Sequence, residues 1–237
     1  MSTQNYQPGP LGTVLVSGGS SGLGAAVVEL VHAAGGWPVV LDMQEPALEL
    51  ADFRLVDVAD GEATERAVRD LAERHNGLDA VVTAAGIDSC GPIEKVSTSD
   101  WENVVRVNLF GTAAVIRAAL PYLEHAHGRI VTIASTLGLR VAADASAYCA
   151  SKFGVVGLTR ALAMELAGRV GVTLVVPGGM RTGFFDGREE QYRPPDVSKL
   201  VPPAVIADSI VHALGRPRGT EVRELVVCHE EEPSWPC

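Results

Sequence analysis

A glycine-rich turn between a strand and a helix is the feature that most constrains this chain. Residues 13–16 form a short β-branched run, which predicts a buried strand. The run leads into Ser17-Gly-Gly-Ser-Ser-Gly-Leu-Gly24, and helical spacing of apolar residues begins at Ala25. Glycines let the backbone turn sharply, and the following helix presents unpaired N–H groups that favour an anion such as a pyrophosphate. The spacing Gly18-x-x-x-Gly22-x-Gly24 differs from the commonest dinucleotide fingerprint, so a plain structural turn stays open at this point.

The rest of the chain repeats this alternation of β-branched runs and helical patterns. Such alternation predicts an α/β fold with a parallel sheet covered by helices on both faces. No composition shift marks a second domain. The expected strands span residues 13–16, 37–41, 53–56, 79–83, 129–133, 172–176 and 223–228, and the expected helices begin at 25 and span about 62–75, 101–120, 148–166 and 203–214.

Length, composition and charge narrow the class of protein. With 237 residues, 47% of them hydrophobic, the chain can bury one large core. A net charge of −10 without any Lys/Arg run argues against a nucleic-acid partner. The polar N-terminus is unlike a signal peptide, and no apolar run looks long enough to span a bilayer. Scattered cysteines without metal spacing suit a reducing compartment, so we expect a cytoplasmic protein with no membrane partner and no metal site.

These patterns also suggest boundaries within the chain. We expect a flexible lead-in over residues 1–10, one domain over 11–229, and a mobile substrate loop at about 183–200, which holds glycines and two adjacent prolines. Residues 230–237 form an acidic tail to which the sequence assigns no structure.

Asp42 closes the second expected strand, 18 residues after Gly24. A carboxylate at this place can accept hydrogen bonds from the hydroxyls of a ribose and would repel a 2′-phosphate. No Arg or Lys lies in the glycine loop or next to Asp42, so the sequence favours NAD over NADP. The alternative interpretation of Asp42 is an ordinary turn residue at a strand end.

Tyr148 and Lys152 are four residues apart in a stretch with helical character, which places them on one helix face. An ammonium beside a phenol favours the phenolate and lowers the pKa of the tyrosine, which would then transfer protons near neutral pH. Taken alone, the pair does not establish this chemistry, because the spacing Tyr-x-x-x-Lys is common and also arises as an accidental surface pair on a helix.

Taken in order, these and other residues resemble the short-chain dehydrogenase/reductase family over roughly residues 11–229. The resemblance implies a doubly wound (Rossmann) parallel sheet of about seven strands, and most members of the family are homodimers or homotetramers. The residues that carry it are Gly18, Gly22, Gly24, Asp57-Val58, Ala84-Ala-Gly86, Asn108, Ser135, Tyr148, Lys152, Pro177-Gly178 and Thr182.

The resemblance also implies roles for the catalytic set. Tyr148 would be the general acid/base, and Lys152 would bind the ribose hydroxyls and lower the pKa of Tyr148. Ser135 would donate a hydrogen bond to the substrate oxygen. Asn108 would hold a water in a proton relay, with its backbone kinking the long helix.

The resemblance also implies which residues contact the cofactor, and Ala84 to Gly86 would line it. Asp57 and Val58 would contact the adenine, and Met180 and Thr182 would hold the carboxamide. One departure is Thr83, where the family usually has an asparagine that ties the central strands together. The expected cofactor-binding residues are Gly18, Ser20, Ser21, Gly22, Leu23, Gly24, Asp42, Met43, Asp57, Val58, Ala84, Ala85, Gly86, Tyr148, Lys152, Pro177, Gly178, Met180 and Thr182.

The expected function is hydride transfer between NAD(H) and a secondary alcohol or ketone. The alternatives are an NADP-linked biosynthetic ketoreductase and a non-catalytic, redox-sensing dinucleotide-binding protein. The helices at 101–120 and 148–166 are apolar on more than one face, which predicts a homo-oligomer. We expect a largely apolar substrate pocket, with Asp88 and Arg140 as polar anchors, lined by Ile87, Asp88, Ser89, Cys90, Leu137, Leu139, Arg140, Phe184, Phe185 and Tyr192.

Overall fold

The computed structural model describes residues 9–47, 49 and 51–235, and these form one seven-stranded parallel sheet with helices on both faces. The strand order is β3-β2-β1-β4-β5-β6-β7, and every neighbouring pair is parallel. The predicted fold class is confirmed. Most of the expected lead-in, residues 1–8, lies outside the described residues. The strands are β1 (Thr13–Ser17), β2 (Trp37–Asp42), β3 (Asp52–Leu55), β4 (Ala80–Thr83), β5 (Arg129–Ile133), β6 (Gly171–Pro177) and β7 (Glu224–Val227).

The helices follow the expected positions. The long helix expected over 101–120 is three consecutive segments, α3, η1 and α4. The segment expected as a loop at 183–200 contains three short 3₁₀ turns, at Gly183–Phe185, Glu190–Tyr192 and Val197–Lys199. The longer helices are α1 (Gly22–Ala33), α2 (Gly61–Arg74), α3 (Thr98–Val105), η1 (Arg106–Gly111, π-helical), α4 (Thr112–Ala126), α5 (Ser146–Glu165) and α6 (Pro203–Leu214).

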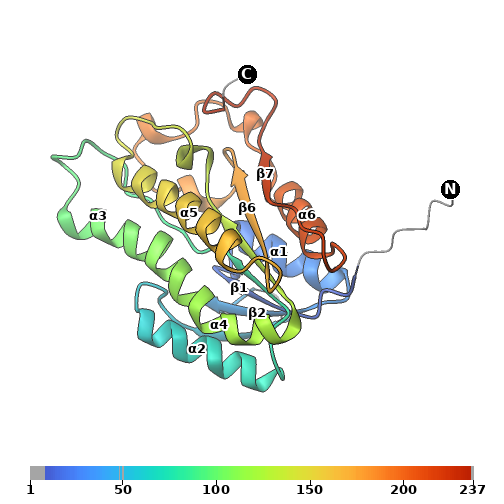
Figure 1. Cartoon of the computed structure of the whole chain (residues 1–237). Helices are drawn as coiled ribbons and strands as arrows, with labels where there is room; N and C mark the ends of the chain where they lie inside the picture. The colour runs from blue at the N-terminus through green and yellow to red at the C-terminus, as the bar shows by residue number, and fades with distance from the viewer. Residues whose placement is uncertain (1–8, 48, 50, 236–237) are drawn as a thin grey trace, which may run out of the picture.

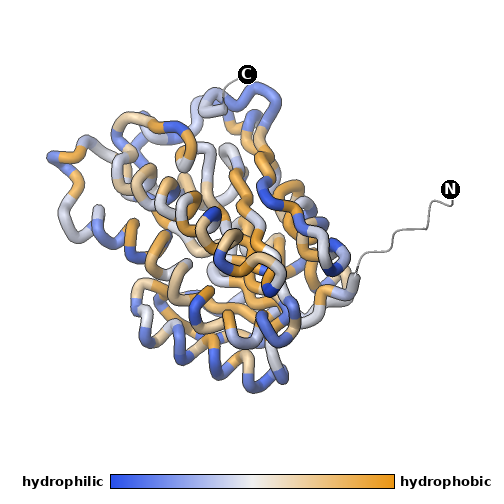
Figure 2. Tube along the Cα trace, in the orientation of Figure 1, coloured by the Kyte–Doolittle hydropathy of each residue, from blue (hydrophilic) through white to orange (hydrophobic). Residues whose placement is uncertain are grey.

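Two apolar layers hold the helices on the sheet. Side chains alternate across a strand, so Val14 and Val16 face one layer and Leu15 the other. The first layer packs under α1 and α6, and the second under α2, α4 and α5, as the arrangement in Figure 1 shows. Figure 2 shows the same pattern, with hydrophobic segments concentrated along the strands between the helices. Full burial of a side chain such as Leu15 contributes about 2 kcal/mol to stability.

The long helix from α3 to α4 is irregular at its centre. Its N-terminus is capped by Ser97, whose Oγ accepts a hydrogen bond from the Asp100 N–H at 3.1 Å. Near Asn108, where a kink is expected, the helix makes the π-helical turn η1. By length and composition the run Thr98–Ala126 could span a membrane, contrary to the expectation that no apolar run is long enough, but 56% of its apolar window is buried inside this fold, as in a core helix.

Parallel strands bring all their carboxyl ends to one edge of the sheet. The strand order reverses direction between β1 and β4, which opens a crevice between the loops that follow them. Thr83 ends β4 beside Thr132 of β5 and is buried. Its hydroxyl has no hydrogen-bonding partner within the described part of the chain, so it does not replace the tie that the family asparagine would provide.

We expect Thr83→Val to leave the free energy of unfolding unchanged or to raise it by about 1 kcal/mol, because it removes a buried hydroxyl without a partner and keeps the side-chain shape. Thr132→Val is the matched control, since the Thr132 hydroxyl lies 2.7 Å from the Thr159 hydroxyl. That control should lose about 1–2 kcal/mol. Urea unfolding of both variants measures the difference, and equal losses would contradict the assignment.

Candidate active site

The glycine loop after β1 has a backbone shape that side chains would obstruct. Gly18 and Gly22 have φ of 73° and 52°, in the left-handed region that favours glycine. A Cβ on Gly24 would lie 1.9 Å from the Gly18 carbonyl oxygen, and a Cβ on Gly18 would lie 2.6 Å from the Ala85 amide nitrogen. The loop therefore passes close to the segment after β4 and leads straight into the N-terminus of α1. Such a backbone cradle fits a pyrophosphate.

Asp42, at the end of β2, is fixed at the rim of this loop. Its carboxylate accepts hydrogen bonds from the Ser20 N–H at 3.0 Å and the Gln44 N–H at 3.1 Å. The Ser20 hydroxyl donates to the Gln44 carbonyl at 2.7 Å, which closes the arrangement. The carboxylate is therefore held in place at the rim of the cavity before any ligand binds.

A cavity of about 880 Å³ lies beyond the carboxyl ends of the strands. It brings together all the expected cofactor-binding residues except Ser20, together with Ser135. Asn108 lies outside its lining. Of the expected substrate wall, it includes Ile87, Asp88, Leu137, Phe184, Phe185 and Tyr192, and leaves out Ser89, Cys90, Leu139 and Arg140.

Tyr148 and Ser135 meet in this cavity. Ser135 follows β5, and its hydroxyl accepts a hydrogen bond from the Leu137 N–H at 3.1 Å, which fixes its direction. Tyr148 lies in the first turn of α5, and its ring centroid is 5.6 Å from that of Phe184. Burial raises the pKa of the Tyr148 phenol, and the neighbouring Ser135 hydroxyl partly lowers it again.

Lys152 lies one helical turn after Tyr148 and is only 5% exposed. Its Nζ donates to the Ile133 carbonyl at 2.9 Å and lies 5.6 Å from the centroid of the Tyr148 ring. Burial lowers the pKa of Lys152 to about 8. The pKa of Tyr148 thus shifts in the opposite direction to the one predicted, because burial outweighs the lowering by Ser135 and Arg188.

Asn108 connects the segments that carry the site through buried hydrogen bonds. Its side chain is 1% exposed and pairs with the backbone of Ile87, accepting from the N–H at 2.8 Å and donating to the carbonyl at 2.9 Å. It also donates to the Ser151 hydroxyl at 2.9 Å, which in turn donates to the Tyr148 carbonyl at 2.8 Å. The side chain thus positions the segments that carry the site.

The structure adds wall residues that the sequence pattern did not indicate. The tail, to which no structure was assigned, returns to the cavity. The Gly179 N–H donates to Glu232 at 3.0 Å, and the Ser234 hydroxyl lies 2.7 Å from that of Thr136. Arg188, in the segment 183–200, also lines the cavity. These residues follow no periodic pattern, so only their contacts identify them.

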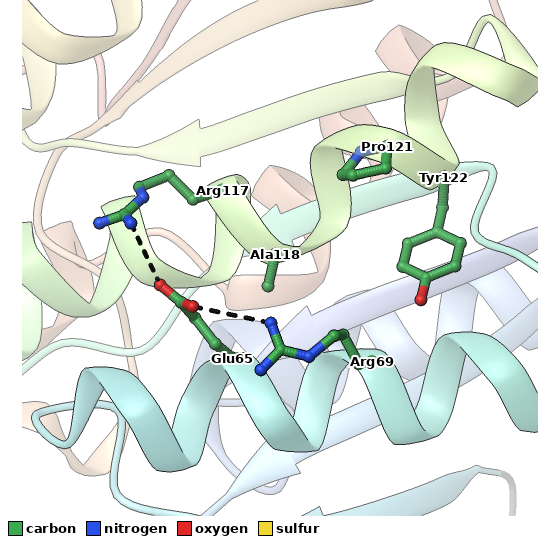
Figure 3. Close-up of a pocket in the computed structure, with 6 residues that line it drawn as sticks. All are labelled: Glu65, Arg69, Arg117, Ala118, Pro121 and Tyr122. Carbon is green, nitrogen blue, oxygen red and sulfur yellow. Dashed lines mark ion pairs between the residues drawn. The ribbon is translucent and has the colours of Figure 1, made fainter.

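A smaller pocket of about 180 Å³ lies between α2 and α4, away from this site (Figure 3). The Glu65 carboxylate lies there between Arg69 and Arg117, at 3.7 and 3.5 Å. Each charge in it is already paired, and Tyr122 is its only other titratable lining residue. The pocket thus lacks the arrangement of a proton donor and an anion cradle that the larger cavity has.

Comparison with known proteins agrees with this geometry. A model of the short chain dehydrogenase family matches residues 12–193. The chain belongs to this family. It is 30% identical to an uncharacterized oxidoreductase of Staphylococcus aureus over 224 residues, covering 90% of this chain and 95% of the relative. It is 31% identical to a trans-4-hydroxycyclohexanecarboxylate dehydrogenase of Sinomonas cyclohexanicum over 191 residues, covering 73% and 74% of the two chains.

Solved structures share the fold at lower identity. An aldohexose dehydrogenase of Thermoplasma acidophilum superposes with a TM-score of 0.84 at 24% identity, covering 93% of this chain and 94% of that one. An alcohol dehydrogenase of Thermococcus sibiricus, complexed with 5-hydroxy-NADP, has a TM-score of 0.82 at 23% identity, covering 92% and 97%. The protein is therefore an oxidoreductase of the short-chain dehydrogenase family.

The lowered pKa of Lys152 gives a pH-dependent stability. Between about pH 8 and the ordinary value near 10.5 the unfolded chain binds more protons than the folded one, so stability rises with pH in this window. Below pH 8 both states are protonated and the full penalty of the buried ammonium is present.

We therefore expect Lys152→Met to lose this dependence. Between pH 7.5 and 9.5 the wild type should gain stability relative to the variant, by up to about 1.4 kcal/mol per pH unit inside the window. Chemical denaturation at each pH measures the gain, and Lys95→Met, at an exposed lysine, is the control. A constant difference between wild type and Lys152→Met across this range would refute the shift.

Proposed function

We propose that the protein transfers a hydride between NAD(H) and a secondary alcohol or ketone, with Tyr148 as general acid/base. The observation that carries this proposal is one continuous cavity that joins the glycine loop to Ser135, Tyr148 and Lys152. A nicotinamide cofactor, when bound, accepts or supplies the hydride, and the protein provides binding and orientation. The glycine loop would hold its pyrophosphate, and Asp42 a ribose.

Side chains at the other end of the cavity, away from the glycine loop, would bind the substrate oxygen and exchange its proton. The Ser135 hydroxyl stabilises negative charge on this oxygen by donating a hydrogen bond. The Tyr148 hydroxyl gives the oxygen a proton in reduction and takes it up in oxidation. Its raised pKa keeps it protonated at neutral pH, ready for the reductive direction. Lys152, whose pKa is about 8, supplies the positive charge that favours the phenolate in the oxidative direction.

Asp42 supports NAD as the cofactor. A 2′-phosphate beside this fixed carboxylate would be repelled, and the described cationic residues of the cavity are Lys152, Arg188 and Arg193, none of which is near β2 in the sequence. The NADP-linked ketoreductase remains the alternative, since the Thermococcus sibiricus relative was solved with an NADP analogue. A non-catalytic redox sensor is disfavoured because it would not need Ser135, Tyr148 and Lys152 together.

We also propose a homo-oligomer and a cytoplasmic location. Phe110 and Met164 are 60% and 82% exposed, and they extend the apolar surface of the helices that the sequence analysis singled out. The free thiols of Cys90, Cys149 and Cys228 suit a reducing compartment.

Light scattering tests the proposed assembly. We expect a dimer or tetramer that Met164→Glu weakens, and a monomer at micromolar concentration would contradict the proposal.

We expect Tyr148→Phe to lower kcat at least about 100-fold on a confirmed substrate, because it removes the group that transfers the proton. A screen of secondary alcohols, sugars and steroids for NADH formation identifies that substrate. NADH binding, followed by fluorescence, should persist in the variant. Tyr122→Phe, in the distant pocket of Figure 3, is the matched control and should keep full activity. Full turnover by Tyr148→Phe would refute the proposed mechanism.

We expect Asp42→Ala to reduce the preference for NAD over NADP roughly tenfold or more, because it removes the carboxylate that repels the 2′-phosphate. The ratio of kcat/KM for the two cofactors measures the change. Asp57→Ala, at the next strand end, removes a carboxylate that lines the same cavity and serves as the control. An unchanged ratio in Asp42→Ala would show that another feature sets the cofactor preference.

A further inference from the structure

Asp88 and Arg188 face each other inside the substrate end of the cavity. Asp88 follows β4, and Arg188 lies in the segment 183–200. Arg188 Nη2 is 3.1 Å from Asp88 Oδ2, and the two side chains are 15% and 5% exposed. Both residues line the same cavity as Tyr148. A buried ion pair costs desolvation of both charges, so it is weak evidence for a purely stabilising role.

The pair is held firmly from both sides. The Ser89 N–H and the Cys90 thiol donate to the Asp88 carboxylate at 2.8 and 3.2 Å. The Arg188 guanidinium lies 4.7 and 4.8 Å from the ring centroids of Phe184 and Phe185. Phe184 in turn contacts the Tyr148 ring. The two charges are therefore placed within reach of a small substrate that binds at Tyr148.

The hydrogen-bonding capacity of the pair is not used up. Arg188 Nη2 is buried, and despite the ion pair it makes no hydrogen bond of normal geometry with any described residue. A buried charged donor without a hydrogen bond is costly. Because Arg188 also lines the cavity, its guanidinium is the group at this end that would favour an oxygen atom of a ligand. The adjacent Asp88 carboxylate determines which oxygen-containing group of a ligand can bind beside Arg188. It would repel a carboxylate group, but it can accept a hydrogen bond from a hydroxyl.

A hydroxyl is the group that satisfies both partners, since it accepts from Arg188 and donates to Asp88. We propose that Asp88 and Arg188 form a specificity pair that binds a second hydroxyl of the substrate. The substrate class would then be polyols, in which a further hydroxyl accompanies the secondary alcohol. This inference rests on the proposed function and names the substrate class of the same site.

The experiment compares kcat/KM across one carbon skeleton: 2-butanol, butane-2,3-diol, butane-1,3-diol and 3-hydroxybutanoate. A parallel series of cyclohexanol, cyclohexane-1,2-diol and 4-hydroxycyclohexanecarboxylate covers larger substrates. We expect the wild type to prefer a diol over the matching monoalcohol about tenfold or more, and to use the hydroxy acid least.

The variants Arg188→Met and Asp88→Asn distinguish binding of a second substrate hydroxyl from a purely structural role of the ion pair. Either variant should lower kcat/KM for the diol roughly 10- to 100-fold more than it lowers kcat/KM for the monoalcohol. The ratio of the two values is the readout, because an altered charge beside Tyr148 acts on both substrates alike. Asp88→Asn, which keeps the side-chain shape, should also improve use of the hydroxy acid. NADH binding checks that the variants are folded. If Arg188→Met does not fold, the result for Asp88→Asn alone tests the inference. Arg140→Met is the control, because this exposed arginine lies outside the cavity lining.

Three results would overturn the inference while leaving the proposed function intact. The wild type could use monoalcohols and diols equally, it could prefer the hydroxy acid, or the variants could lose activity on all substrates alike. If no alcohol were turned over with either NAD or NADP, the proposed function would itself fail, and the inference with it.

Discussion

The buried side chain of Asn108 joins the segments on which the active site depends. Both N–H groups of its amide are used, one on the Ile87 carbonyl and one on the Ser151 hydroxyl, and its oxygen accepts from the Ile87 N–H. Its backbone carbonyl accepts from the Thr112 hydroxyl at 2.8 Å. In a buried setting a fully satisfied polar group of this kind specifies one geometry, because any shift leaves a donor or acceptor unpaired. The loop after β4, the π-helical turn and α5 are thereby fixed together.

Burial then sets the charge states within this frame. It raises the pKa of Tyr148 and lowers that of Lys152, so in both residues it favours the neutral form. Asp88 and Arg188 also act on the tyrosine, the first raising its pKa and the second lowering it. The proton affinity of the acid/base is therefore a balance among neighbours rather than a property of the Tyr–Lys spacing. Moving one of these charges would shift it.

This balance marks the limit of what the sequence could predict. The strands were predictable because runs such as 13–16 are buried on both faces of a parallel sheet, and Asp42 and Tyr148 because their positions follow from strand ends and helical spacing. The direction of the Tyr148 pKa shift was not predictable from the sequence, because it depends on how deeply the side chain is buried. The hydrogen bonds of Asn108 depend on a π-helical turn that no periodic pattern indicates.

The two ends of the cavity also differ in how far the sequence predicts them. The cofactor end is built mainly from backbone: glycines whose Cβ atoms would collide with neighbouring backbone, and strand ends whose positions follow from sheet register. The substrate end is built from side chains on the segment 183–200 and the tail, where Arg188 and Glu232 find partners far away in the sequence. A side chain added at one of these glycines disturbs the backbone, whereas a side-chain change at the substrate end can alter what the cavity accepts. Family membership can therefore be recognised from the glycine loop and strand ends at 30% identity, while substrate choice has to be derived from the side chains that close the cavity.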